Sequence, residues 1–210
     1  MDILSAVKER RSINFFDPDR KLPDRAIEDL LSIANFSPSS FNLQPWKVVV
    51  VQDAPDKQKL RRCAMNQPKV EEASAVLIML ADPACLEENI DRMLNSWAEL
   101  GYIKQDKKDA NRNAVKNLYG EPGSVRRNYF AVKNTALFAM NLMIAAKGMG
   151  LETHPMDGFD ESCIKTEFNI PEDKIIPMLV CVGYLKQGIR LLPRAFRRSI
   201  EEFVKFGSWK

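Results

Sequence analysis

The 210-residue sequence contains a single histidine, His154, and little that would support side-chain catalysis or a metal centre. With no serine or thiol plainly partnered to it, a nucleophilic triad is unsupported. Next to Pro155, His154 is explained as well by a strand position as by catalysis. No group of histidine, cysteine and carboxylate residues has metal-ligand spacing, so no metal site is predicted. The longest apolar runs, such as residues 75–81, are far shorter than the roughly 20 residues that span a bilayer.

Glycine-rich phosphate loops are also missing. Gly148-Met149-Gly150 follows a helical pattern rather than a strand, and Thr153 stands where the dinucleotide fingerprint needs its third glycine. There is no Walker loop either. A nicotinamide cofactor, if one is used, is therefore not expected to be held by a Rossmann fold.

The charge and the cysteines indicate an ordinary intracellular protein. A net charge of +3 is too small by itself to indicate a nucleic-acid partner. The N-terminal residues lack the charged and apolar regions of a signal peptide. The four cysteines show no paired spacing, so we expect reduced thiols and a cytoplasmic protein without a membrane partner. They are Cys63, Cys85, Cys163 and Cys181.

A composition without breaks predicts one domain over residues 1–210. Apolar periodicity predicts helices over residues 2–11, 23–34, 57–64, 86–100, 125–149, 160–168 and 199–206. Apolar runs predict strands over 48–51, 75–80, 151–156 and 175–184, the first two buried. Alternating strands and helices suggest by themselves a parallel α/β sheet. Residues 101–123 are largely polar and are expected to form a surface excursion that could act as a lid.

Residues 37–46, Ser-Pro-Ser-Ser-Phe-Asn-Leu-Gln-Pro-Trp, join a predicted helix to a predicted strand. Pro38 and Pro45 fix their φ angles and restrict the preceding residues, so the loop is stiff. Its polar groups suit the edge of a planar heteroaromatic ligand. Taken alone, the loop is explained more simply as a capped turn, because Ser and Asn commonly form turns.

Two further segments change this interpretation. Arg10-Arg11-Ser12 precede the loop, and Pro155-Met156-Asp157-Gly158-Phe159-Asp160 follow far downstream. In this order, over nearly the whole chain, the three segments resemble the flavin-dependent nitroreductase family. The resemblance implies an α+β fold, a central mixed or antiparallel sheet flanked by helices, and overrules the parallel sheet. It also implies an intertwined homodimer with FMN at the interface.

The resemblance implies that the FMN phosphate is held by Arg10, Arg11 and Ser12, and by a C-terminal arginine. Arg197 matches best, and Arg194 or Arg198 could compensate for Ala195, where close relatives carry a basic residue. Without the resemblance, the N-terminal arginines are explained by the dipole of the first helix. The C-terminal arginines then form a solvated face or a weak nucleic-acid patch.

The resemblance also implies the contacts around the flavin ring. Backbone amides of Asp157 and Gly158 face flavin N5 and O4, and an N–H aimed at the reacting atom N5 stabilises the reduced ring. Asn14 occupies a position that is often lysine in relatives, which removes one positive charge. The remaining ring contacts implied are Asn66, Lys69, Pro155 and Met156, and, from the other subunit, Pro38, Ser39, Ser40, Asn42 and Gln44.

The implied activity is ping-pong hydride transfer from NADH or NADPH, through flavin N5, to a nitroaromatic, a quinone or a similar acceptor. No side chain is needed as an acid, base or nucleophile. Phe41, Tyr102 and Tyr119 are expected to line the substrate site, with Trp97 as a further candidate, although ordinary packing explains each of them. A reductive dehalogenase, an ene reductase and a non-catalytic flavin-binding protein stay open as alternatives.

Overall fold

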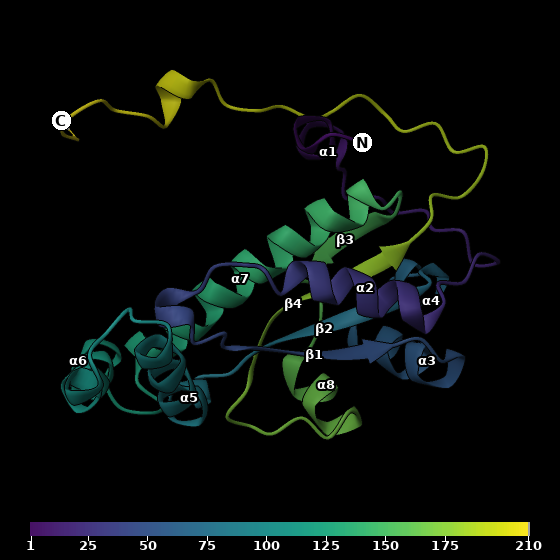
Figure 1. Ribbon diagram of the computed structural model, residues 1–210. Helices are drawn as coiled ribbons and strands as arrows, with labels where there is room; N and C mark the ends of the chain where they lie inside the picture. Colours follow the sequence, from purple (N-terminus) through teal and green to yellow (C-terminus); the bar gives the residue numbers. More distant parts are fainter. Residues whose placement is uncertain (210) are drawn as a thin grey trace.

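The computed structural model describes residues 1–209 and contains one four-stranded sheet (Figure 1). Its strands lie in the order β1 (Trp46–Val51), β2 (Ala75–Ala81), β4 (Ile175–Gly183) and β3 (Glu152–Met156). All three pairings are antiparallel, as expected for an α+β fold. The parallel alternative fails because the helical connections return the chain to the same end of the sheet, as where Val51 pairs with Val76.

The helices lie close to their predicted positions. They are α1 (Ile3–Glu9), α2 (Asp24–Ala34), α3 (Ala54–Cys63), α4 (Lys69–Glu72), α5 (Cys85–Glu99), α6 (Lys108–Tyr119), α7 (Val125–Gly148) and α8 (Glu161–Glu167). Asp2 caps α1 by accepting from the N–H of Leu4 at 3.0 Å, and the predicted cap Asp160 accepts from Cys163 at 3.0 Å. Both satisfy N–H groups that the first helical turn leaves free.

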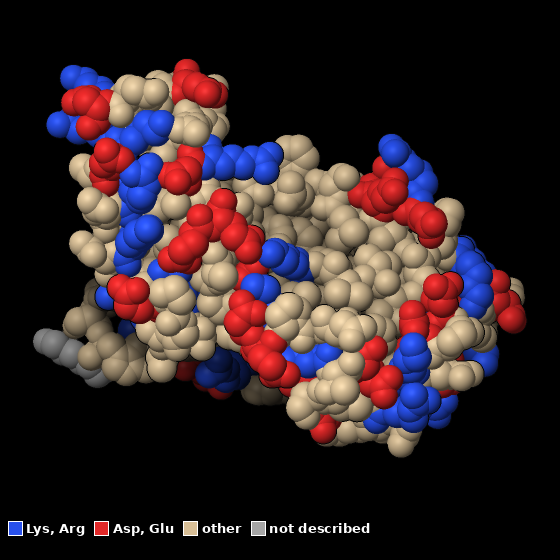
Figure 2. All heavy atoms as spheres, turned by 90° about the horizontal axis from the view of Figure 1, so that it is seen from below, with Lys and Arg blue, Asp and Glu red and all other residues tan. Residues whose placement is uncertain are grey.

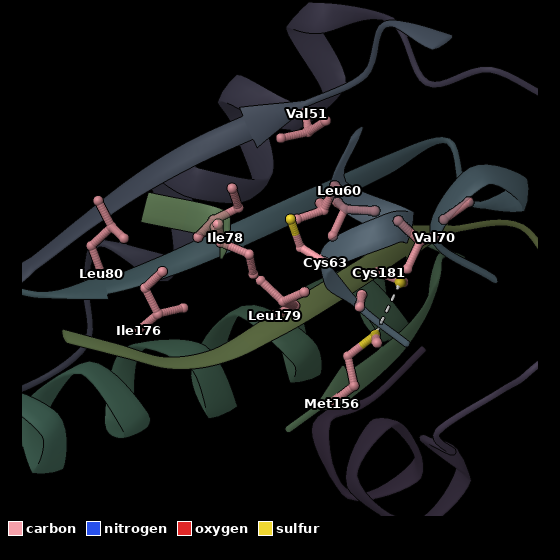
Figure 3. Packing of buried hydrophobic residues seen from close by; sticks show 14 of the residues in the cluster. Val51, Leu60, Cys63, Val70, Ile78, Leu80, Met156, Ile176, Leu179 and Cys181 are labelled. Carbon is pink, nitrogen blue, oxygen red and sulfur yellow. Dashed lines mark hydrogen bonds between the residues drawn. The ribbon is translucent and has the colours of Figure 1, made fainter. Parts of the chain in front are cut away.

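Alternate residues of β2 face two hydrophobic layers. Leu77 and Met79 pack with α2 and α7, whereas Ile78 and Leu80 pack with α3 and α8 (Figures 1 and 3). All seven residues of β2 are buried, as its continuous apolar run predicted. Strand β1 was also expected to be buried, but it lies at the sheet edge, and Val50 is 37% exposed because no strand covers that side.

Helix α7 is long and apolar enough to cross a bilayer by length and composition alone, although its uninterrupted apolar runs are short. Half of its apolar window is buried within the protein. Phe138 and Leu142 pack against the sheet and α2. These contacts are those of the central helix of a folded domain, which passes the same test of length and composition.

The stretch 101–123 is more ordered than its polarity suggested. It contains the 3₁₀ turn η2 (Gln105–Lys107) and helix α6, whose Val115 is fully buried against α5. A single narrow apolar face packs this helix against α5. The surrounding polar residues obscure its apolar periodicity, so the sequence did not predict a helix here. The predicted helix 199–206 is instead a short 3₁₀ turn, η3 (Ile200–Glu202).

Two of the four cysteines form a disulfide, so the expectation of reduced thiols is wrong for this pair. Cys63 at the end of α3 is bonded to Cys163 in α8, 100 residues away. Sequence spacing carried no sign of the bond because only the packing of α3 against α8 brings the two residues together. Cys85 and Cys181 are buried free thiols, and burial raises the pKa of Cys181 to about 12.

The C-terminal stretch leaves the body of the molecule after β4, passes α1 and ends well away from the sheet (Figure 1). Its large apolar side chains face outward: Leu192 is 80% exposed, Phe196 77% and Phe206 94%. Such a stretch cannot gain stability from its own chain alone, because little of its apolar surface leaves water.

Candidate functional site

Three arginines, Arg10, Arg194 and Arg197, lie together where α1 ends. Arg10 is the C-cap residue of α1. Arg194 of the C-terminal stretch donates to the carbonyl of Lys8 and, at 3.3 Å, to that of Arg10. Arg11 fixes this stretch in place by donating to the carbonyl of Leu192 at 2.8 Å. Within residues 1–209, no ion pair to a carboxylate is found for Arg10, Arg194 or Arg197. The sequence had placed these residues in one site, and the fold does bring them together.

The charge of this cluster is uncompensated. Burial and the neighbouring Arg194 and Arg197 lower the pKa of Arg10, against a smaller opposing effect of Glu152. The Nη1 atom of Arg10 is buried and has no hydrogen-bond partner among the described residues. A guanidinium in this setting is suited to an oxyanion with several acceptors, such as a phosphate.

The segment after α1 runs beside β3. Ser12 forms a bridge with Thr153, and the Ile13 N–H donates to the Thr153 carbonyl at 3.2 Å. The Thr153 hydroxyl is buried without a hydrogen-bond partner. Ser12 is therefore held at the start of β3, next to the arginines, as the phosphate-binding prediction requires.

A second polar group lies further along the same strand. The Lys69 ammonium lies 2.7 Å from Asn14 Oδ1 and 3.0 Å from His154 Nε2. His154 Nδ1 in turn lies 2.7 Å from the carbonyl oxygen of Ile13. The structure thus brings the predicted residues Asn14 and Lys69 together, and it adds His154, which the sequence left open between a strand position and catalysis.

Two loops meet beside this group. Gln67 Nε2 donates to the Gly158 carbonyl at 2.9 Å and to the Ala64 carbonyl at 3.2 Å. A Cβ on Gly158 would lie 2.9 Å from that same nitrogen, so a larger residue there would have to displace the Gln67 side chain. The Asp160 N–H donates to the carbonyl of Cys63 at 2.8 Å, which joins the loops a second time. Gln67 was missed from the sequence, and its only signal was its place between Asn66 and Lys69.

The first of these loops has an unusual backbone conformation, and the second carries two free N–H donors. Met65 and Asn66 have positive φ angles of 53° and 55°, a strained conformation for residues other than glycine. Arg61 stabilises this turn by donating to the Asn66 carbonyl at 3.1 Å. Within residues 1–209, no acceptor is found for the N–H groups of Asp157 and Gly158. These are the two amides that the sequence assigned to the flavin ring.

The loop at residues 37–46 is strained and tightly held. Phe41, Asn42 and Gln44 have φ angles of 53°, 52° and 50°. Asn134 of α7 accepts from the Ser40 N–H at 3.0 Å, and the Ser39 hydroxyl accepts from the Gln44 N–H at 3.0 Å. Beside the loop lies a cavity of about 390 Å³, lined among others by Asn42, Gln44 and Arg92.

The predicted substrate residues gather around Phe41. Its ring centroid lies 6.2 Å from that of Trp97 and 6.1 Å from that of Tyr119. Tyr102 joins the group through Trp97, at 6.5 Å, and is 75% exposed. Phe41, Tyr119 and Trp97 thus belong to one aromatic cluster at the end of α5 and α6, with Tyr102 at its surface.

Within one chain, this loop lies far from the arginines. The loop enters β1 at Trp46, which pairs with Ala81, and Ala81 pairs with Ile175 at the start of β4. Thr153, beside Ser12, pairs with Val182 at the other end of β4. Seven residue steps separate Ile175 from Val182, a distance of about 24 Å along the strand. A single chain therefore does not bring the loop to Ser12 and the arginines.

Positive and negative side chains are interspersed on the face drawn in Figure 2, around an uncharged central area. That face carries no broad basic surface of the kind that follows a nucleic-acid backbone.

Comparison with known proteins decides the family, because the family model described as "Nitroreductase family" matches residues 7–184. The chain belongs to the nitroreductase family. MhqN of Bacillus subtilis, named as an inferred NAD(P)H nitroreductase, is 32% identical over 200 residues, which cover 95% of this chain and 96% of MhqN.

Solved structures of nitroreductases have the same fold. The inferred nitroreductase ydfN of Bacillus subtilis has a TM-score of 0.90 and 30% identity, with 97% of each chain covered. An inferred nitroreductase of Exiguobacterium sibiricum, solved in complex with FMN, has a TM-score of 0.87 and 25% identity, covering 99% of this chain and 98% of that one. The predicted nitroreductase-like α+β fold is confirmed.

Proposed function

We propose that this nitroreductase binds FMN and transfers two electrons from NADH or NADPH to an electron-poor acceptor such as a nitroaromatic compound or a quinone. The observation that carries the proposal is the buried, unpartnered Nη1 of Arg10 beside Arg194 and Arg197. An FMN phosphate would satisfy this donor and compensate the three cations. The Exiguobacterium sibiricum relative, whose structure contains FMN, supports the proposal.

The remaining site residues fit the rest of the cofactor. Ser12 lies next to the arginines for the phosphate. For the ring, Lys69 lies beside His154 of β3, and Asn66 lies in the loop that contacts Gly158 through Gln67. The free amides of Asp157 and Gly158 would orient the ring and stabilise its added electrons. FMN supplies the hydride chemistry when bound, and the protein supplies binding, orientation and electrostatics. On this proposal no side chain acts as an acid, base or nucleophile.

We also propose a homodimer, in which the loop at residues 37–46 of one subunit completes the site of the other. Three features of the single chain support it: the separation of about 24 Å along the sheet, the open edge of β1, and the exposed apolar side chains of the C-terminal stretch. An edge strand and an extended apolar segment both gain stability by pairing with another copy. Sedimentation analysis should give a dimer, and a monomer that still binds FMN would contradict this arrangement.

An absorbance spectrum of the purified protein tests the proposed function. We expect a bound flavin spectrum that bleaches on anaerobic addition of NADH or NADPH and recovers when a quinone or nitroaromatic compound is added. Bound flavin that is not bleached would favour a non-catalytic flavin-binding protein. Bleaching followed by reduction of halogenated or enone acceptors alone would favour the dehalogenase or ene-reductase alternative. Protein that takes up no FMN would overturn the proposal. The cytoplasmic location stays a prediction.

The aromatic cluster gives a prediction on acceptor selectivity. Separate replacements of Trp97, Tyr102 and Tyr119 by alanine should change KM for bulky aromatic acceptors by about 10-fold, because each removes part of an apolar wall. FMN content should change less than KM, since the phosphate contacts at the arginines are untouched, although Trp97 and Tyr119 pack against Phe41 of the loop at residues 37–46. Tyr184→Ala is the matched control, because Tyr184 stacks under Arg20 at 3.6 Å instead of joining the cluster. Unchanged steady-state kinetics in all three variants would remove the cluster from the substrate site.

A further inference from the structure

The contacts of His154 fix its protonation. A carbonyl oxygen can only accept, so the Nδ1 atom that lies 2.7 Å from the Ile13 carbonyl carries the ring proton. Nε2 then has a free electron pair and accepts a hydrogen bond from the Lys69 ammonium at 3.0 Å. The half-buried imidazole is therefore neutral and serves as an acceptor for Lys69.

The Lys69 ammonium has three N–H donors, and among the described residues 1–209 two of them have acceptors. Asn14 Oδ1 accepts one at 2.7 Å and His154 Nε2 accepts the other. The third donor is free for a ligand. Because these two acceptors come from different segments, they hold the end of a flexible side chain in one direction.

The groups around His154 keep it neutral. Burial and the charge of Lys69 on α4 lower the pKa of His154, against the opposing hydrogen bond to Ile13. Cys181, opposite it on β4, is a neutral thiol whose pKa burial raises to about 12. Glu152, two residues earlier on the same strand, is paired with Lys147 at 2.5 Å. These surroundings supply no free anion that would favour the imidazolium.

We infer that His154 is a positioning residue, which holds the Lys69 ammonium toward the flavin ring by accepting one of its hydrogen bonds. The inference rests on the proposed function, in which Lys69 stabilises the negative charge that the ring gains on reduction. His154 does not contact the substrate on this inference and acts through Lys69 alone. A leucine at this position would leave the Lys69 side chain with one acceptor and more freedom.

The test compares His154→Leu, His154→Gln, Lys69→Met and the double variant His154→Leu/Lys69→Met. FMN affinity is measured by fluorescence titration and the reduction potential of the bound flavin by spectroelectrochemistry. We expect His154→Leu to weaken FMN binding about 10-fold and to lower the potential, since it removes a hydrogen bond to a charged group. Glutamine offers an amide oxygen as acceptor, so His154→Gln should keep most of the FMN affinity and most of the reduction potential. The double variant should be no worse than Lys69→Met alone, because both changes remove the same interaction. Additive losses, or no loss in His154→Leu, would overturn the inference.

A second measurement remains informative if a variant folds poorly or if FMN does not bind. His154 is the only histidine, so its ring protons give one unambiguous NMR titration in the cofactor-free protein. We expect a pKa below the ordinary value of about 6.5, rising in Lys69→Met. In the wild type, FMN affinity should fall on acidification through that lowered pKa, because the imidazolium can no longer accept from Lys69. An unchanged pKa in Lys69→Met would show that the contact does not form. Loss of FMN binding by the wild type at all pH values would instead count against the proposed function.

Discussion

Replacing Arg10 by alanine is expected to weaken FMN binding by about 2–3 kcal/mol, or roughly 30- to 150-fold. The Nη1 atom of Arg10 is buried without a hydrogen-bond partner among the described residues. The like charges of Arg194 and Arg197 repel the charge of Arg10. In the cofactor-free protein the substitution removes a repulsive, desolvated cation. We therefore expect thermal stability without FMN to be unchanged or slightly higher, whereas the stabilisation gained on adding FMN should largely disappear.

Fluorescence titration with FMN and thermal melts with and without FMN measure both effects. Arg25→Ala is a suitable control, because Arg25 is exposed and its ion pairs are with Glu28 and Asp29 of its own helix. Arg197→Ala should act in the same direction as Arg10→Ala. If both variants keep full FMN affinity, the phosphate site has been misplaced.

Reduction of the Cys63–Cys163 disulfide should lower the stability of the protein by about 3–5 kcal/mol, because the bond closes a loop of 100 residues in the unfolded chain. For a chain of this size the melting temperature should fall by roughly 6–20 °C. Cys63 is buried in the hydrophobic layer that contains Leu60 and Ile78 (Figure 3), so the native packing can persist in the reduced protein.

Thermal melts with and without a dithiol reductant test this expectation. The double variant Cys63→Ala/Cys163→Ala is the control and should melt at one temperature under both conditions. Alkylation of the unreduced, unfolded wild type should label two thiols, Cys85 and Cys181. Four labelled thiols would show that the bond is absent from the purified protein. Stable disulfides are rare in cytosolic proteins, so two labelled thiols would count against the predicted cytoplasmic location.

Much of the local structure follows from the sequence. The apolar run of β2 predicts a strand buried on both faces, and Asp160 predicts the start of α8, because burial and capping act over a few neighbouring residues. The polar segments around Arg10, Ser40 and Gly158 could be singled out as well, but their assignment to one ligand came from the resemblance to a family. Helix α6 was missed because a single buried residue, Val115, does not create a clear periodicity.

By itself, the sequence determined the helices and strands with strong patterns, the polar segments, and the family to which they belong. Only the tertiary structure decided that the sheet is wholly antiparallel rather than mixed, that Cys63 meets Cys163, and that His154 contacts Lys69. It also placed the loop at residues 37–46 at the opposite end of the sheet from Arg10. The physical reason is that these contacts join distant residues: 94 to 107 positions apart between β2 and β4, 100 between the two cysteines, and 85 between Lys69 and His154. Their formation depends on how whole layers pack, which local patterns of charge and hydrophobicity do not encode.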